Sequence, residues 1–527
     1  MAMRSGDPNP PPAGHEATHA GGVDDRRRGP LGVWLFDHQT TLLAGALAIA
    51  LVAGLVAATR HTGPISSAAG PAASLSPTEQ LAGGQGPAGP SGSPSAAGTA
   101  VMAKGSGSSA QPVPTIETSK KNGPAPLTAS DRGVTKDSVT LGWLAMSQET
   151  MVYGSSLGMQ VLSYPAQDYV DPFVKDINAA GGIDGRKLKV AVVEYNPLSM
   201  DDMQAVCVLL AEDLKVFGTV APAGYYGDAE VCLADKEIPT VTMNGSSADT
   251  NYRREKGWVR STVMNKDRTL KNWVDWAVQA GTATSKSRIG VWWQDVPEDQ
   301  QVVKDVLLPY LKSRGLNVVD KFVFSSDYSR TPTEASTATL RFKSSNVDLV
   351  WPAGNLLLNT LFTNEAEAQN YHPKYTASDF AQLAVDYASQ NYNANQWDRV
   401  RALTVLRTGE LVAGKPPTPQ QKLCSDIYAR NGGKPAKNTN DGAYTAFACE
   451  HMWLFVKAIR VAGPDLTRAR FLAAMDSLGT YDERVTLSDS LTFRKGKYDA
   501  ADRYAIVEWH KECKCYWQVE GFRKGAW

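Results

Sequence analysis

Three short apolar segments decide the fold: Leu188-Lys-Val-Ala-Val-Val-Glu194, Val216-Phe-Gly-Thr-Val-Ala221 and Ile238-Pro-Thr-Val-Thr-Met243. A segment with apolar residues at helical spacing separates the first two, and a shorter helical segment separates the second from the third. Strands that alternate with helices through short connections are typical of a parallel, doubly wound sheet. The sequence therefore predicts an α/β protein with a parallel, doubly wound sheet.

The loops that follow these strands carry candidate ligand-binding residues. In doubly wound sheets, small ligands lie just beyond the carboxyl ends of the strands. Here those ends offer hydroxyl, amide and backbone N–H groups, which indicate binding rather than catalysis. The alternative is that the two tyrosines in the first loop simply cap the sheet. The candidates are Gly224, Tyr225, Tyr226, Asn244, Gly245, Ser246 and Ser247.

A second β/α block of similar size begins near Val259. Two such blocks predict two lobes with a cleft between them. Ahead of the opening strands we expect a strand at 138–144, a long loop at 145–157 and a helix at 157–180. The later chain is expected to contain helices at 266–281, 299–314, 332–345, 355–370, 417–431, 440–462 and 467–476, strands at 288–293, 316–324, 347–351, 374–377 and 400–406, and β-hairpins at 490–520.

The N-terminal part contains one uncharged apolar segment, residues 39–59. About 20 residues at 1.5 Å each span roughly 30 Å, which is enough to cross a bilayer as a helix. Three arginines at 26–28 precede it, and the positive-inside rule then places residues 1–38 in the cytoplasm. A cleaved signal peptide is the alternative, because Val56-Ala-Ala58 resembles a cleavage site. The long stretch before the segment favours an uncleaved transmembrane anchor.

The segments on either side of the apolar one lack apolar periodicity. Residues 1–38 are rich in Pro, Gly and charge, which predicts a disordered tail. Residues 60–131 are dominated by Gly, Ala, Ser and Pro, which is typical of a flexible linker. The globular part is therefore expected outside the cell, tethered to its membrane.

Length and charge limit the possible functions. At 527 residues the chain is too long for one ordinary core, so two or three globular units plus tails are expected. The 54 Lys and Arg residues balance the 54 Asp and Glu residues, and the net charge is zero. This balance argues against a nucleic-acid partner, which would need a basic face.

The 6 cysteines all lie on the C-terminal side of the apolar segment. An even number on one side of a membrane predicts disulfides in an oxidising compartment, with reduced core cysteines as the alternative. Two pairs are predicted because their members fall on successive helices with equal gaps. The predicted pairs are Cys207 with Cys232 and Cys424 with Cys449, while Cys513 and Cys515 either pair with each other or are both free.

Three motifs resemble those of enzymes. His15-Glu-Ala-Thr-His19 spells a zinc-protease pattern, but it lies in the Pro-rich tail with no core to bury it. Gly84-Gln-Gly-Pro-Ala-Gly89 matches the G-x-G-x-x-G pattern, but no strand precedes it and it belongs to the Gly- and Pro-rich linker. Gly154-Ser-Ser-Leu-Gly158 matches a serine-hydrolase pattern, but about ten residues separate Ser156 from the preceding strand, too many for a nucleophile elbow. His451 is interpreted as a core histidine. A serine hydrolase remains an alternative, but no catalytic residue and no metal site is predicted.

The run Asp176-Ile-Asn-Ala-Ala-Gly-Gly-Ile-Asp-Gly-Arg-Lys-Leu188 resembles the signature of the type I periplasmic solute-binding proteins of the branched-chain amino-acid (Leu/Ile/Val) binding family, which serve ABC transporters. The likeness extends from about Val134 to the C-terminus. Supporting pieces are Tyr153-Gly154, Ile238-Pro-Thr240 and Gly442-Ala-Tyr-Thr-Ala-Phe447.

This resemblance implies two Rossmann-like lobes joined by hinge crossovers. It assigns residues 132–259 and 400–487 to the first lobe, and residues 260–399 and 488–527 to the second. It also implies ligand contacts from loops on both sides of the cleft. These are Tyr153, the Gly224–Tyr226 loop and the Asn244–Ser247 loop in the first lobe, and Gln294, Asp295, Gly354 and Asn355 in the second.

The family implies an extracytoplasmic receptor without cofactor or enzymatic activity. Such a receptor closes around a small polar, amino-acid-like ligand and presents it to an ABC-type permease. The uncleaved anchor and cytoplasmic tail also fit a membrane-tethered extracellular sensor or adaptor. Tyr225 and Tyr226 stand where the amino-acid binders usually have small hydroxyl residues. The family's lipid-anchoring cysteine is also replaced, by the apolar segment.

Overall fold

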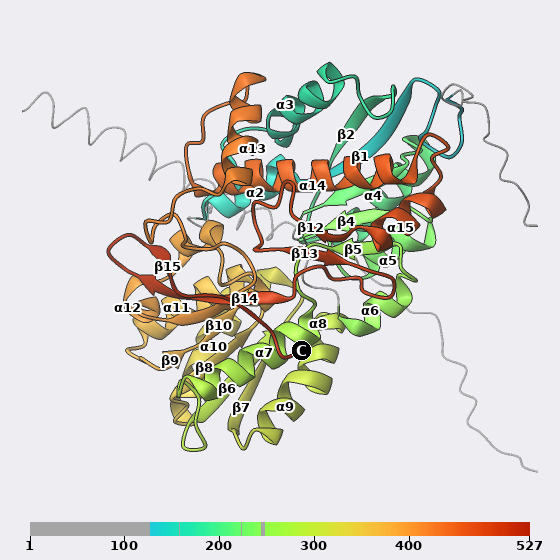
Figure 1. Ribbon diagram of the computed structural model, residues 1–527. Coiled ribbons are helices and arrows are strands. Elements are labelled where there is room, and N and C mark those ends of the chain that lie inside the picture. Colours follow the sequence, from blue (N-terminus) through green and yellow to red (C-terminus); the bar gives the residue numbers. More distant parts are fainter. Residues whose placement is uncertain (1–126, 157–158, 223, 244–247) are drawn as a thin grey trace, which may run out of the picture. The chain divides into compact units, whose positions relative to one another are not determined.

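The computed structural model describes residues 127–156, 159–222, 224–243 and 248–527. They form two β/α halves, which lie in the upper and lower parts of Figure 1. The first half is built on the sheet β2-β1-β3-β4-β5 and the second half on the sheet β7-β6-β8-β9. The predicted α/β architecture with parallel sheets is confirmed.

The predicted tail, apolar segment and linker, as far as residue 126, lie outside the described residues. Among the described residues, no helix combines the length and apolar character needed to cross a membrane.

The first half contains five parallel strands. β1 lies between β2 and β3, with Leu141 opposite both Val190 and Gly218. Most of these strands are covered on both faces, which explains why they read as apolar runs rather than alternating patterns. The strands are β1 (Ser138–Met146), β2 (Lys187–Tyr195), β3 (Gly218–Ala221), β4 (Thr240–Thr242) and β5 (Val259–Ser261), and the helices between them are α3 (Ala166–Ala179), α4 (Met200–Val208), α5 (Asp228–Asp235) and α6 (Asp249–Arg254).

Three late helices complete the core of the first half: α13 (Pro419–Arg430), α14 (Thr439–Ala462) and α15 (Arg468–Ser477). α14 passes along the first sheet in Figure 1. At Gly218 an added Cβ would lie 2.4 Å from the ring of Phe455, so only glycine lets the helix approach the strand this closely.

The second half contains four parallel strands whose core is rich in tryptophan. The Trp273 and Trp351 ring centroids lie 4.6 Å apart. Trp292, Trp397 and Trp509 are also fully buried in this core. The strands are β6 (Arg288–Gln294), β7 (Asn317–Phe324), β8 (Leu349–Ala353) and β9 (Lys374–Tyr375), and the main helices are α7 (Lys266–Gln279), α8 (Pro297–Val302), α9 (Leu308–Ser313), α10 (Thr331–Ser344) and α11 (Leu356–Ala368).

A mixed sheet, β10-β11-β14-β15, packs into the same core as the second half. β11 falls in the stretch 400–487 that was expected in the first lobe, yet it pairs with β10 and β14. The antiparallel pair β14 and β15 agrees with the β-hairpins predicted at 490–520, and a further small pair is formed by β12 (Gly479–Tyr481) and β13 (Leu491–Phe493). The bounds of the mixed sheet are β10 (Ala377–Ser378), β11 (Arg401–Thr404), β14 (Arg503–His510) and β15 (Cys515–Lys524).

Two local predictions were wrong, and a third predicted helix contains an irregular turn. The expected loop 145–157 contains a helix, α2 (Gln148–Ser156), whose first turn is capped by the Ser147 hydroxyl accepting from the Thr150 N–H at 3.2 Å. The helix expected at 157–180 begins only at Ala166, after Pro165. The helix expected at 299–314 is divided into α8, a π-helical turn at Val303–Leu307, and α9.

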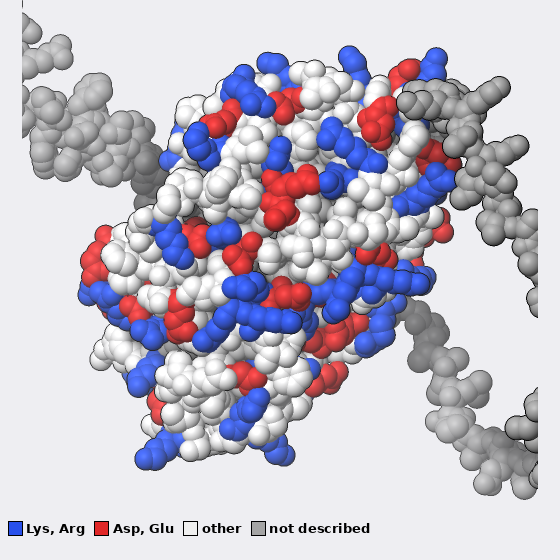
Figure 2. Space-filling model, viewed as in Figure 1, with Lys and Arg blue, Asp and Glu red and all other residues white. Residues whose placement is uncertain are grey.

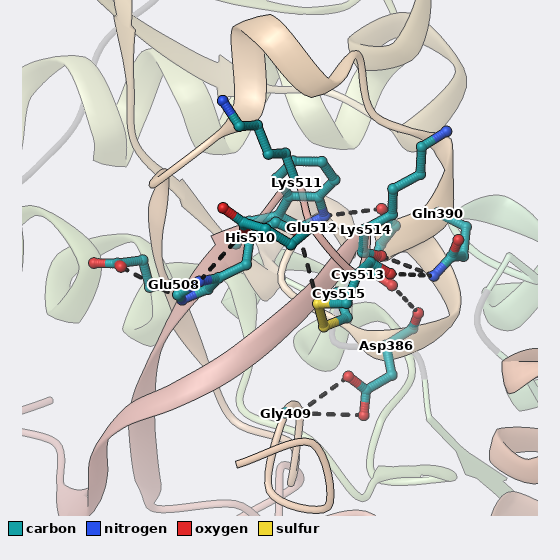
Figure 3. The surroundings of a disulfide bond; sticks show 12 residues. Asp386, Gln390, Gly409, Glu508, His510, Lys511, Glu512, Cys513, Lys514 and Cys515 are labelled. Carbon is teal, nitrogen blue, oxygen red and sulfur yellow. Dashed lines mark hydrogen bonds and ion pairs between the residues drawn. A yellow bond between two sulfur atoms is a disulfide. The ribbon is translucent and has the colours of Figure 1, made fainter.

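All three disulfides are present, and the two predicted pairs are confirmed. Cys207–Cys232 joins α4 to α5, and Cys424–Cys449 joins α13 to α14. Cys513 pairs with Cys515 at the turn between β14 and β15 (Figure 3).

Figure 2 shows basic and acidic side chains interspersed over the visible face. This distribution agrees with the balanced composition of the chain.

Candidate functional site

A cavity of about 990 Å³ lies between the two halves. Small-molecule sites usually enclose roughly 300–1,000 Å³, so this volume suits a ligand at the upper end of that range. The first half contributes α2, the loops after β2 and β3, α6 and the start of α14. The second half contributes the loops after β6, β7 and β8 together with the segments 380–389 and 406–412.

The side of the cavity formed by the first half is predominantly apolar, and we call it the methionine wall. Each of its methionines comes from a different stretch of the first half, and Val161, Leu162 and Leu198 lie beside them. Methionine side chains are flexible and polarizable, so they adapt to irregular apolar ligands. The methionines are Met146, Met151, Met159, Met200 and Met243.

Exposed apolar side chains also line the cavity. Tyr153 on α2 is 44% exposed, and Leu411 and Val412 opposite it are 58% and 45% exposed. Large apolar side chains exposed together are unusual unless a ligand or a partner covers them. These residues therefore mark an apolar entrance.

The second half contributes a hydrogen-bonded polar cluster made by Gln294, Tyr328 and Asn355. The Gln294 Oε1 accepts from the Tyr328 hydroxyl at 3.2 Å and from the Asn355 Nδ2 at 2.8 Å. The Asn355 Nδ2 also donates to the Tyr328 hydroxyl at 3.0 Å, while its Oδ1 caps α11. Each side chain is therefore oriented by the other two.

The two halves approach each other at this corner of the cavity. Tyr226, from the loop after β3, lies near Tyr328, from the loop after β7. The Ala248 N–H, shortly after β4, donates to the Glu298 Oε1 at 2.9 Å. This hydrogen bond thus joins the two halves beside the cavity.

The cationic side chains at the same corner are neutralised by carboxylates. Lys266 is buried and pairs with Asp299, and its Nζ lies 3.8 Å from Glu298. Arg254 pairs with Asp228 at 2.7 Å. Burial raises the pKa of Glu298 to about 7, although Lys266 opposes that shift.

The structure places most of the predicted ligand contacts along the cavity. Gly224 has φ of +105°, and an added Cβ there would lie 3.1 Å from the Met146 Cε, so glycine leaves room for the methionine wall. The four residues Asn244–Ser247 lie outside the described residues. The predicted contacts that line the cavity are Tyr153, Gly224, Tyr226, Gln294, Asp295, Gly354 and Asn355.

Tyr225 lies away from the cavity. Its ring is fully buried against Tyr195, and its hydroxyl donates to the Met203 carbonyl at 2.8 Å. The adjacent Tyr226 faces the cavity instead. The capping alternative therefore describes Tyr225 and not Tyr226.

Sequence reasoning missed the methionine wall and Tyr328. The methionines are scattered over about 100 residues, and no local pattern joins them. Tyr328 follows β7 at the carboxyl end of a strand, which is the signal that could have identified it.

Ser156 and His451, which a serine hydrolase would have to bring together, are not in contact. Ser156 is exposed, and its hydroxyl donates to the Tyr153 carbonyl at 2.7 Å. His451 is fully buried between the Thr262 hydroxyl and the Phe447 carbonyl, and burial lowers its pKa to about 3. It is the core histidine that the sequence predicted. Among the described residues no His, Cys, Asp and Glu cluster could hold a metal ion.

A sequence profile of the periplasmic binding proteins matches residues 163–514. The chain is a type I periplasmic binding protein. This match agrees with the resemblance seen in the sequence. Members of the matched family bind ligands and are not enzymes, which supports a ligand-binding receptor.

Solved structures share the fold of this receptor. The fatty acid ABC transporter substrate-binding protein from Thermomonospora curvata has a TM-score of 0.57 at 13% identity, covering 76% of this chain and 95% of that one. An R. palustris solute-binding protein in complex with benzoate gives 0.56 at 12% identity, covering 74% and 97%. A branched-chain amino acid transporter substrate-binding protein from Streptococcus pneumoniae in complex with isoleucine gives 0.53 at 14%, covering 73% and 100%. No curated protein sequence matches the chain.

Proposed function

We propose that this receptor captures a small organic molecule with a largely apolar body and delivers it to an ABC-type permease. The observation that carries the proposal is the methionine wall, which makes the first-half side of the cavity predominantly apolar. Covering it with ligand contributes about 25 cal/mol per Å² of apolar surface removed from water. The small polar, amino-acid-like ligand expected from the sequence would leave most of this surface uncovered.

Similar folds hold apolar ligands in other proteins. The Thermomonospora curvata protein is named for fatty acids, and the R. palustris structure contains benzoate. Since identity to both is low, these names support only the chemical plausibility of an apolar ligand.

Closure of the two halves gives the binding mechanism. A ligand that contacts both halves stabilises the closed arrangement by the difference between its affinities for the closed and open forms. The Ala248–Glu298 hydrogen bond joins the two halves and favours the closed arrangement independently of the ligand. A permease then recognises the closed receptor; a membrane sensor would recognise the same shape.

Thermal denaturation of the purified protein tests the ligand class. A ligand at 100 times its Kd adds about 2.7 kcal/mol of stability, which raises the Tm by several degrees. We expect at least one member of a panel of decanoate, benzoate and their uncharged amides to raise the Tm, and leucine and glutamine to leave it unchanged. A rise with leucine alone would contradict an apolar ligand.

We also propose that residues 39–59 anchor the receptor in the cell membrane. The uncharged composition of the segment and the arginines at 26–28 support this. Alkaline extraction of membranes from expressing cells should leave the full chain in the pellet and release a variant that lacks residues 39–59. Release of the full chain would instead indicate a cleaved signal peptide.

A further inference from the structure

The amide of Gln294 has one occupied side and one free side. Gln294 is 3% exposed and lines the cavity. Its Oε1 accepts two hydrogen bonds, from Tyr328 and Asn355, whereas its Nε2 has no hydrogen-bond partner in the described part of the chain. A flipped amide would point its NH2 at the Asn355 NH2, so the network fixes the orientation.

A buried donor without a partner is costly, by about 1–3 kcal/mol. A ligand oxygen placed against the Nε2 would remove that cost. It would also gain from an amide whose orientation is already fixed, because no side-chain ordering accompanies binding.

A second donor lies at the same corner. Asn251 on α6 is 4% exposed and lines the cavity, and its Nδ2 likewise lacks a partner among the described residues. The Ala248 carbonyl accepts from the Asn251 N–H at 2.9 Å, and the Ala248 N–H donates to Glu298, one turn beyond Gln294. The two residues with unpartnered N–H donors therefore line the same cavity, Asn251 from the first half and Gln294 from the second.

The charges of this corner discriminate between ligand head groups. Four carboxyl groups line it, and only two cations accompany them, each already paired with one of the four. An anionic head would lie in a net negative environment, whereas an uncharged carbonyl would meet only the donors. The carboxyl groups are Asp228, Asp295, Glu298 and Asp299, and the cations are Arg254 and Lys266.

We propose that the Gln294 amide, with Asn251 opposite it, binds an uncharged carbonyl group, such as that of an amide or ester, whose apolar body lies along the methionine wall. The ligand then spans the cavity from the polar corner toward the entrance formed by Tyr153, Leu411 and Val412. This assignment rests on the proposed function, since it requires an apolar ligand in the cavity.

Three probes that share one apolar body test the head group: 4-butylbenzamide, 4-butylbenzoate and butylbenzene, each titrated calorimetrically into the purified full chain. We expect the amide to bind at least tenfold more tightly than either of the others. The Gln294→Met variant should bind 4-butylbenzamide no more tightly than butylbenzene, while the Kd of butylbenzene changes by less than twofold. The Asn355→Leu variant removes a hydrogen bond that orients the Gln294 amide. It should therefore also reduce the ratio of the affinity for 4-butylbenzamide to the affinity for butylbenzene.

Gln279→Met is the matched control, because Gln279 is exposed on α7 and does not line the cavity. An unchanged Tm shows that each variant is folded. If the three probes bind with equal Kd values and Gln294→Met changes none of these values, the head-group assignment is overturned. The proposal that the cavity binds an apolar ligand is then unaffected. If the benzoate binds most tightly, the uncharged head group is overturned. If no probe binds the wild-type chain, the proposed function itself fails.

Discussion

The two halves follow the same β/α plan but are stabilised differently. The first half combines two strands of 9 residues, β1 and β2, with strands of 4, 3 and 3 residues at β3, β4 and β5, and two disulfides join its helices. The second half has strands of 7, 8, 5 and 2 residues at β6, β7, β8 and β9 and a core filled by tryptophan. No disulfide joins two helices in the described part of the second half.

The same contrast extends to the cavity. The first half provides the methionine wall, and the second half provides the oriented polar cluster of Gln294, Tyr328 and Asn355. One half therefore adapts to the ligand body, and the other fixes its polar end. The difference teaches that lobes with the same topology can divide affinity and specificity between them.

The largest expected effect is on the tryptophan core. Trp351→Ala should lower the free energy of unfolding by about 3–5 kcal/mol, because it leaves a large cavity beside Trp273. Denaturant unfolding measures this. The matched change Trp517→Ala, at a position that is 43% exposed and stacked on His510, should cost clearly less. Equal losses from both would contradict the role of the buried tryptophans.

The next effect removes the α4–α5 disulfide. Cys207→Ala with Cys232→Ala should cost about 3 kcal/mol, since the bond closes a loop with a sequence separation of 25. The Cys513–Cys515 bond spans a separation of 2, so its removal should cost much less. Unfolding curves of both double variants, measured without reductant, decide this. A larger loss from the Cys513 and Cys515 variant would refute the loop-length argument.

A somewhat smaller effect concerns pH. The pKa of Glu298 is raised from 4.5 to about 7 by burial. The folded form therefore binds the proton more tightly, so the contribution of Glu298 to stability is fully present below pH 4.5 and is lost as the pH rises through 7. The Glu298→Gln variant should lose up to about 3 kcal/mol less unfolding free energy than the wild type as the pH rises, because each unit of pKa shift corresponds to about 1.36 kcal/mol.

Asp379 and Asp386 also have raised pKa values, about 7 and about 6, so the comparison must use the difference between wild type and variant. Identical pH profiles for wild type and Glu298→Gln would show that Glu298 titrates normally.

The smallest effect shortens the methionine wall. Met151, which is 7% exposed, contributes contacts along the ligand body. Met151→Ala should weaken the binding of 4-butylbenzamide about three- to tenfold, which corresponds to about 1 kcal/mol of lost apolar contact. Leu340→Ala, an exposed change on α10, is the control and should have no effect. Unchanged affinity in Met151→Ala would exclude the wall as the binding surface.

Much of the fold could be predicted from the sequence because each strand is a continuous apolar run with a turn signal after it. The run Asp176–Leu188 identified the family directly. Helix α2 was missed because Gln148–Ser156 buries only Met151, so it shows no apolar face.

The candidate site could be predicted only in part. Residues at strand ends were accessible to sequence reasoning because topology places them at one edge. The sequence could not show how the two adjacent tyrosines are oriented. Tyr225 faces a core made by residues distant in the sequence, whereas Tyr226 faces the cavity. The polar cluster joins loops about 30 residues apart, so no local pattern revealed it.

The most direct test of the apolar cavity is calorimetric titration of 4-butylbenzamide and of leucine into the purified protein at several temperatures. The methionine wall predicts that 4-butylbenzamide binds with a negative heat-capacity change, the mark of buried apolar surface, and that leucine gives no binding heat. Saturable binding of leucine with no binding of 4-butylbenzamide would contradict the assignment of this cavity to an apolar ligand.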